Sequence, residues 1–104
     1  MTVTSTFRGA VSSSPATNPL VYNVSVVLAN TEYSQLLSPS TKKFMVKCRG
    51  KAKLQLSYIS GDSGILFVTI PANTAYTEDD IDFTGTLYFR SDTASQVVEI
   101  VEWT

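Results

Sequence analysis

The chain has 104 residues, of which 43% are hydrophobic and 16% are charged, and its formal net charge is −1. This length accommodates one small domain, and the apolar fraction is high enough for a folded core and too high for a chain that is disordered throughout. Histidine is absent and cysteine occurs once, so the commonest general base is missing and no intrachain disulfide can form. These counts predict a protein that is not an enzyme and that needs no cofactor.

The first segment, residues 1–20, is rich in Ser, Thr, Asn and Pro, which favour turns and irregular structure. It predicts a flexible N-terminal arm, followed by one domain over residues 21–104. We expect Phe7, Arg8 and Val11 to anchor this arm on a neighbouring subunit, and a frayed end is the alternative. The sequence shows neither a signal peptide nor a membrane span, so we expect synthesis in a cytoplasm and no membrane partner.

Apolar and polar residues alternate from Leu20 onward, which is typical of half-buried strands. A first strand places Tyr22, Val24, Val26 and Leu28 on one face, and a second, short apolar run covers residues 33–37. The longest alternation predicts an inward set made of Phe44, Val46, Cys48, Ala52, Leu54, Leu56 and Tyr58. Gly50 interrupts this set and predicts a bulge or a tight bend between two strands.

The second half of the chain contains more strand patterns, separated by turn signals. Residues 60–64 predict a hairpin turn into the apolar run 65–70, and an acidic connector at residues 78–82 precedes further strands in 87–89 and 96–103. About seven short strands without a helix predict an all-β fold. The fold class that we expect is an antiparallel β-sandwich.

Charge is unevenly distributed along the chain. Residues 42–53 contain six basic side chains and no acidic one, whereas residues 54–104 contain eight acidic side chains and one basic one. Because the basic residues alternate with apolar ones, strand geometry predicts that most of them share one face. The face that we expect to interact with a protein partner consists of Lys47, Arg49, Lys51 and Lys53, with Lys43 beside it.

Three interpretations of this basic face remain open. It is a solvated outer surface, it complements the acidic connector of another subunit, or it contacts nucleic acid phosphates. No aromatic residues are interleaved with the basic ones and the net charge of the chain is negative, so we expect no nucleic acid partner.

The last strand has apolar residues on both of its faces. Val97 and Val101 share one face, and Val98 and Ile100 share the other. The run 65–70 is likewise apolar on both faces, except for Thr69. A sandwich hides one face of each sheet, so the outward apolar residues need cover from another subunit or from loops of the same chain. We expect Val97, Val101 and the terminal Trp103 to contact a second copy, which predicts a homo-oligomer.

Two segments suggest chemistry and are better explained structurally. Residues 61–64 match the nucleophile segment of chymotrypsin-like proteases, but without histidine the serine has no usual base, and we interpret them as a turn. The acidic residues at 78–82 are candidates for a hard cation, but their spacing does not match a calcium loop and a solvated connector is favoured. We therefore predict no catalytic, cofactor-binding or metal-ligating residue, and no small-molecule ligand.

Four stretches resemble small virion structural proteins of tailed bacteriophages. They are residues 48–58 (CRGKAKLQLSY), 68–76 (VTIPANTAY), 87–91 (LYFRS) and 97–103 (VVEIVEW), and the likeness extends over residues 44–104. Proteins of this kind are β-sandwich or β-tulip modules that decorate capsids or join head and tail parts. The resemblance implies a role in assembly without chemistry.

Together, the residues and the resemblance lead to one expectation with two alternatives. The expected function is that of a capsid decoration, or cement, protein of a phage virion, which stabilises the shell through contacts with itself and with the major capsid protein. A neck or tail accessory protein of the virion is the first alternative. A carbohydrate-binding, lectin-like sandwich with exposed aromatic rings is the second.

Overall fold

The computed structural model describes residues 18–104, so the predicted arm residues Phe7, Arg8 and Val11 lie outside the described part. The described residues form strands and connecting loops, and they contain no helix long and apolar enough to cross a membrane. The strands are β1 (Pro19–Val26), β2 (Tyr33–Leu36), β3 (Lys43–Cys48), β4 (Leu54–Ser57), β5 (Val68–Ile70), β6 (Ala75–Glu78), β7 (Thr86–Ser91) and β8 (Gln96–Trp103).

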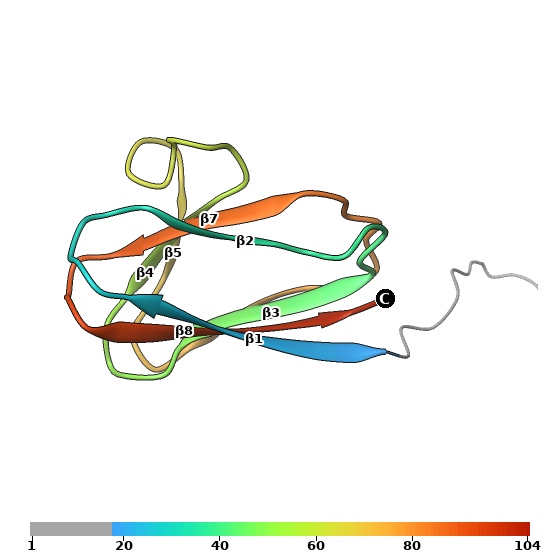
Figure 1. Cartoon of the computed structure of the whole chain (residues 1–104), viewed down its shortest axis with the longest axis horizontal. Helices are drawn as coiled ribbons and strands as arrows, with labels where there is room; N and C mark the ends of the chain where they lie inside the picture. The colour runs from blue at the N-terminus through green and yellow to red at the C-terminus, as the bar shows by residue number, and fades with distance from the viewer. Residues whose placement is uncertain (1–17) are drawn as a thin grey trace, which may run out of the picture.

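The strands form two four-stranded sheets that lie face to face (Figure 1). The first sheet has the order β1-β8-β3-β6 and the second has the order β2-β7-β4-β5. All the strand pairs are antiparallel, and β1 pairs with β8, β2 with β7, β3 with β6 and β4 with β5. The chain is therefore one long hairpin with its tip between β4 and β5, rolled up into two layers. Eight strands in this order make a jelly roll, and the expected antiparallel β-sandwich is confirmed.

The core lies between the two sheets and follows the alternation of the strands. In β3 and β7 every second side chain is buried, because successive side chains of a strand point to opposite faces. The buried hydrophobic residues are Val26, Leu37, Phe44, Val46, Cys48, Ala52, Leu54, Leu56, Ile70, Leu87, Phe89, Val98 and Ile100. Six of the seven residues that the longest alternation placed inward are in this set.

The structure differs from the expected strands in four details. It has eight strands, because β6 forms between the apolar run 65–70 and the expected strand 87–89, where no strand was expected. β1 begins at Pro19, so the expected boundary between residues 20 and 21 falls inside this strand. Leu28 lies beyond the end of β1 and is 59% exposed, and Tyr58 lies just beyond β4 and is 40% exposed. Alternation does not show where a strand ends, so Leu28 does not continue the face of β1, and Tyr58 was wrongly assigned to the inward set.

The expectation of a single basic face is also wrong. β3 belongs to the first sheet and β4 to the second, and the chain crosses from one sheet to the other between Cys48 and Leu54. Gly50 lies in a bend within this crossing, so of the two predicted alternatives the bend between two strands is confirmed and the bulge is not. The apolar side chains of both strands point inward, because both sheets face the same core. The outer faces of the two sheets, however, point in opposite directions. The basic residues are therefore spread from the outer face of the first sheet around the edge of the sandwich.

Candidate interaction surface

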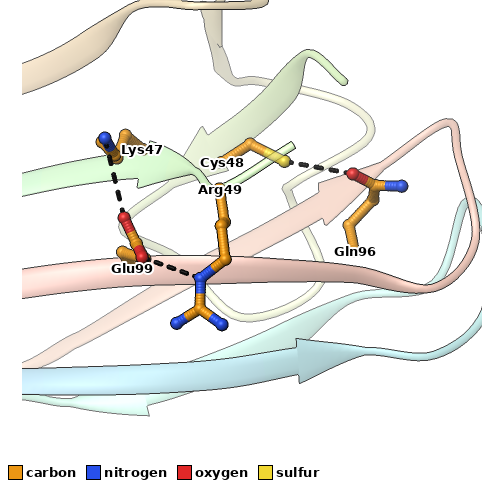
Figure 2. Close-up of polar contacts among 5 residues, drawn as sticks. All are labelled: Lys47, Cys48, Arg49, Gln96 and Glu99. Carbon is orange, nitrogen blue, oxygen red and sulfur yellow. Dashed lines mark hydrogen bonds and ion pairs between the residues drawn. The ribbon is translucent and has the colours of Figure 1, made fainter. Parts of the chain in front are cut away.

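Glu99 on β8 forms ion pairs with two of the predicted basic residues, Lys47 and Arg49, within the same chain (Figure 2). It lies opposite Lys47 in the register of β3 and β8. Its carboxylate accepts a hydrogen bond from Arg49 Nε at 2.8 Å and lies 3.7 Å from Lys47 Nζ. The hydrogen bond from Arg49 is the main cause that holds the pKa of Glu99 below its usual value.

Other basic residues of the predicted set also have partners within the chain. Lys53 Nζ lies 3.9 Å from an oxygen of Asp92, and Lys43 Nζ lies 4.8 Å from the centre of the Trp103 ring. For Lys51, the structure of residues 18–104 shows no ion pair. Two carboxylates, Glu99 and Asp92, thus balance part of the basic charge within residues 18–104, and neither belongs to the acidic connector.

The two apolar sets of β8 lie where their parity predicts. Val98 and Ile100 point into the core and are fully buried. Val97, Val101 and Trp103 lie on the outer face of the first sheet and are half-buried. There Val101 is flanked by Val21 on β1 and Met45 on β3, so neighbouring strands cover part of its surface.

The two most exposed large hydrophobic side chains of the described residues, Ile65 and Leu66, lie elsewhere, in the loop between β4 and β5, which projects from the second sheet (Figure 1). We define the apolar patch as five residues of this loop and of the start of β5, with exposed fractions between 39% and 72%: Ile59, Ile65, Leu66, Phe67 and Val68. Exposed apolar residues that cluster in this way mark interaction sites more often than scattered ones do. The patch is therefore the strongest candidate surface of the described residues.

A partly buried polar clamp holds the base of this loop. Glu32, in the connection between β1 and β2, accepts hydrogen bonds from Gly61 N at 2.9 Å, from Ser63 N at 3.1 Å and from Ser63 Oγ at 2.6 Å. Ser63 is 1% exposed. Burial alone would raise the pKa of Glu32, but the hydrogen bonds from Ser63 and Gly61 outweigh it and the pKa is lowered.

Backbone hydrogen bonds continue the order of the loop beyond the clamp. The carbonyl of Asp62 accepts from Ile65 N and from Leu66 N, both at 3.0 Å, and Asp62 N donates to the carbonyl of Ile59 at 3.1 Å. These bonds fix the turn from which Ile65 and Leu66 point outward. The apolar side chains are thus presented to solvent by an ordered loop, which lowers the entropy lost when a partner binds.

Two hollows flank the exposed ring of Tyr58. The first has a volume of about 400 Å³ and lies against the apolar patch, lined mainly by Leu56, Leu66, Phe67 and Val68. The second, which we call the acid-rimmed hollow, has a volume of about 290 Å³ and is lined by Phe44, Tyr58, Glu78, Ile81, Asp82 and Phe83. Tyr58 lines both hollows, so the two lie next to each other.

Aromatic rings build the floor of the acid-rimmed hollow. The ring centres of Phe44 and Phe83 are 5.9 Å apart, and those of Tyr58 and Phe83 are 5.7 Å apart at an interplanar angle of 63°. Edge-to-face contacts of this kind hold rings in fixed orientations. Two carboxylates, Glu78 and Asp82, lie beside this aromatic floor.

A chain of hydroxyl groups links the hollow to its acidic side. Tyr58 Oη lies 3.3 Å from Tyr76 Oη, and Tyr76 Oη donates to Glu78 Oε2 at 2.9 Å. Burial and the neighbouring Tyr76 hydroxyl raise the pKa of Tyr58 well above its usual 10.0, so this hydroxyl stays protonated. It is therefore a hydrogen-bond donor and not a nucleophile.

The structure and the sequence differ most on where the candidate surface lies. The sequence indicated that the apolar run 65–70 has more apolar residues than one strand face can bury, but no residue of it was among the predicted contacts. Ile59 and the clamp residue Glu32 were missed altogether. The signal in the sequence was the four consecutive apolar residues 65–68 directly after a turn rich in Gly and Ser.

Residues 18–104 bring together no three His, Cys, Asp or Glu side chains that could hold a metal ion, and this includes the acidic connector. No protein-family model matches the chain, and no curated protein matches it. Among solved structures, the chain is similar to a de novo designed double-stranded β-helix determined by solution NMR, with 13% sequence identity and a TM-score of 0.48. The likeness covers 85% of this chain and 100% of that one, and it carries no argument about function.

Proposed function

We propose that the protein is a non-enzymatic assembly protein that works by binding protein surfaces, its own copies among them. The observation that carries this proposal is the apolar patch, in which Ile65 and Leu66 are 71% and 72% exposed at the end of an ordered loop. Each large side chain that a partner covers contributes about 1.5–3 kcal/mol, so a few of them are enough to hold a subunit interface.

Within this class, we propose a capsid decoration protein of a tailed phage that acts in the virion. This step is supported by the resemblance of residues 44–104 to small virion structural proteins. A jelly roll is compatible with it, since the fold occurs in viral capsid proteins, but also in lectins and cupins, so the fold alone does not select a function. On a shell, many weak contacts repeated by symmetry would act through avidity.

Self-association of the full-length protein tests the role of the apolar patch. Analytical ultracentrifugation over a range of concentrations is expected to show a species larger than a monomer, and Leu66→Ser is expected to dissociate it. The matched control is Leu36→Ser, which removes a leucine of similar exposure, 65%, outside the patch. Equal association of the wild type and both variants would contradict the proposed role of the patch.

Antibody labelling of purified virions tests the phage assignment. Gold-labelled antibody against the protein is expected to cover the heads of tailed particles from the source of this chain. Label confined to the junction of head and tail would assign the protein to the neck instead. Particles without label would overturn the virion role.

A further inference from the structure

The acid-rimmed hollow combines two features that suit a guanidinium group. Its floor consists of the rings of Phe44, Tyr58 and Phe83, and its rim carries the carboxylates of Glu78 and Asp82. Arginine stacks on aromatic faces and forms paired hydrogen bonds to carboxylates, so one side chain can use both features together. A neutral ligand would lack the charge attraction to the carboxylates, and an acidic ligand would be repelled by them.

The carboxylates at this rim have not been neutralised within the described chain. The ion pairs of residues 18–104 use Glu99 and Asp92 as their acids, and none of them involves Glu78, Asp79 or Asp82. Residues 1–17 carry a single charged side chain, Arg8, with Phe7 directly before it and Val11 three residues after it. The segment 7–11 thus offers one cation between two apolar residues.

The surface of the hollow has the complementary arrangement. Tyr58 separates the acidic rim from the first hollow, which the apolar patch lines through Leu66, Phe67 and Val68. An extended peptide that places a cation at the rim can therefore place the apolar residue on one side of that cation against the patch. The segment 7–11 offers such a pair, a cation followed or preceded by an apolar residue.

The position of β1 favours a segment from a second copy. Leu20, Glu102, Phe44 and Glu78 lie in one row across the first sheet, so the start of β1 and the hollow are at opposite edges, roughly 15 Å apart at the usual strand spacing. A segment crossing the outer face of its own sheet would pass over Lys43, which repels Arg8. A neighbouring copy reaches the hollow without that crossing.

We propose that the acid-rimmed hollow of one copy binds residues 7–11 of a second copy, with Arg8 between Glu78 and Asp82 and against the ring of Phe83. This inference rests on the proposed assembly function and names the partner of the candidate surface. Each copy gives one segment and accepts one, so the exchange leaves no hollow empty in a closed dimer or ring. One of the two apolar residues that flank Arg8, Phe7 or Val11, packs toward the apolar patch.

A charge exchange in the full-length protein tests this pairing. Arg8→Glu and Asp82→Lys are each expected to weaken self-association about tenfold at low salt, and the double variant is expected to restore it, because the pair reforms with its signs reversed. The control is Asp92→Lys, which reverses an exposed acidic side chain outside the hollow and is expected to leave the association unchanged. Failure of the double variant to recover while both single variants are weak would overturn the pairing.

The source of the bound segment is read from isotope-filtered NMR on mixed labelled and unlabelled protein. Contacts between Phe7 or Arg8 of one copy and the Tyr58 ring of another are expected. Contacts only within one copy, or none, would overturn the inference. Association that depends on Leu66 but not on Arg8 or Asp82 would overturn it and leave the proposed function standing, whereas a monomer in every variant would contradict both.

Discussion

Tyr22 Oη donates a hydrogen bond of 2.7 Å to Glu102 Oε1 and thereby joins the first strand of the sandwich to the last. The same carboxylate oxygen accepts a hydrogen bond from Ser38 N at 2.9 Å, and the Glu102 side chain is buried, with 1% of the residue exposed. Burial alone would raise the pKa of Glu102, but the hydrogen bonds from Ser38 and Tyr22 prevail and hold it below its usual 4.5. A carboxylate is thus satisfied inside the fold by donors from two separate segments.

Acid is expected to destabilise the protein partly through Glu102. Because its pKa is lower in the folded chain, the contribution of Glu102 is present above its unfolded pKa and is lost as the pH falls through the folded value. Urea unfolding between pH 7 and pH 3 is expected to show a steeper loss of stability for the wild type than for Glu102→Gln, which cannot titrate. Parallel curves would show that Glu102 does not contribute to acid sensitivity.

Removal of the Glu32 carboxylate is expected to loosen the loop between β4 and β5. Glu32→Ala leaves Ser63 N and Oγ without their acceptor, which costs about 1–3 kcal/mol for buried polar groups. Hydrogen exchange in residues 59–67 is expected to accelerate more than exchange in β3. Glu32→Gln keeps one acceptor oxygen and serves as the control, with a smaller effect. Equal acceleration throughout the sandwich would indicate global destabilisation instead.

The two faces of β8 are expected to respond differently to truncation. Ile100→Ala removes a fully buried side chain and is expected to cost about 2–5 kcal/mol in the free energy of unfolding. Val101→Ala, one residue further on the outer face, removes a half-buried side chain and is expected to cost less, about 1 kcal/mol. Denaturant unfolding measures both, and similar costs would contradict the assignment of the faces.

Gly61 is expected to be sensitive to a side chain although it lies in open space. Its φ is +88°, in the left-handed region, and a Cβ placed there meets no atom within 4 Å. Gly61→Ala is therefore expected to cost about 1–2 kcal/mol through the backbone alone. Ser60→Ala, at the exposed neighbouring position, is the control and should change the midpoint of thermal unfolding little.

Much of the layered architecture follows from the sequence, because alternation reports which side chains face the core. Val46, Leu54 and Leu56 are buried as their parity predicts. The pairing of the strands did not follow, since alternation says nothing about which strands are neighbours. The register that brings Glu99 beside Lys47 depends on strands that lie about fifty residues apart in the chain.

The candidate surface followed from the sequence only in part. The run 65–70 was correctly inferred to have more apolar residues than the inner faces of the two sheets can bury. Ile65 and Leu66 of this run are exposed. Val97 and Val101 are partly covered by the strands on either side of β8. The sequence did not show this cover, because it depends on the order of the strands in the sheet. The burial of Glu102 could not be predicted from the sequence either. A carboxylate at an inward position can be buried only when hydrogen-bond donors reach it, and its donors, Tyr22 and Ser38, are distant in the chain.

The nested pairing of strands has a consequence for how the chain reaches its folded state. β4 and β5 are joined by a short connection, whereas β1 cannot find its neighbour until β8 has been synthesised, some seventy residues later. Contacts between such distant segments are slow to form because the intervening chain must first be closed into a loop. For most of its synthesis, a nascent chain therefore carries the β1 segment, eight residues without a charged side chain, without its pairing partner. Its backbone N–H and C=O groups are then open to pairing with another strand. Premature pairing between such segments of separate nascent chains is the hazard built into this topology.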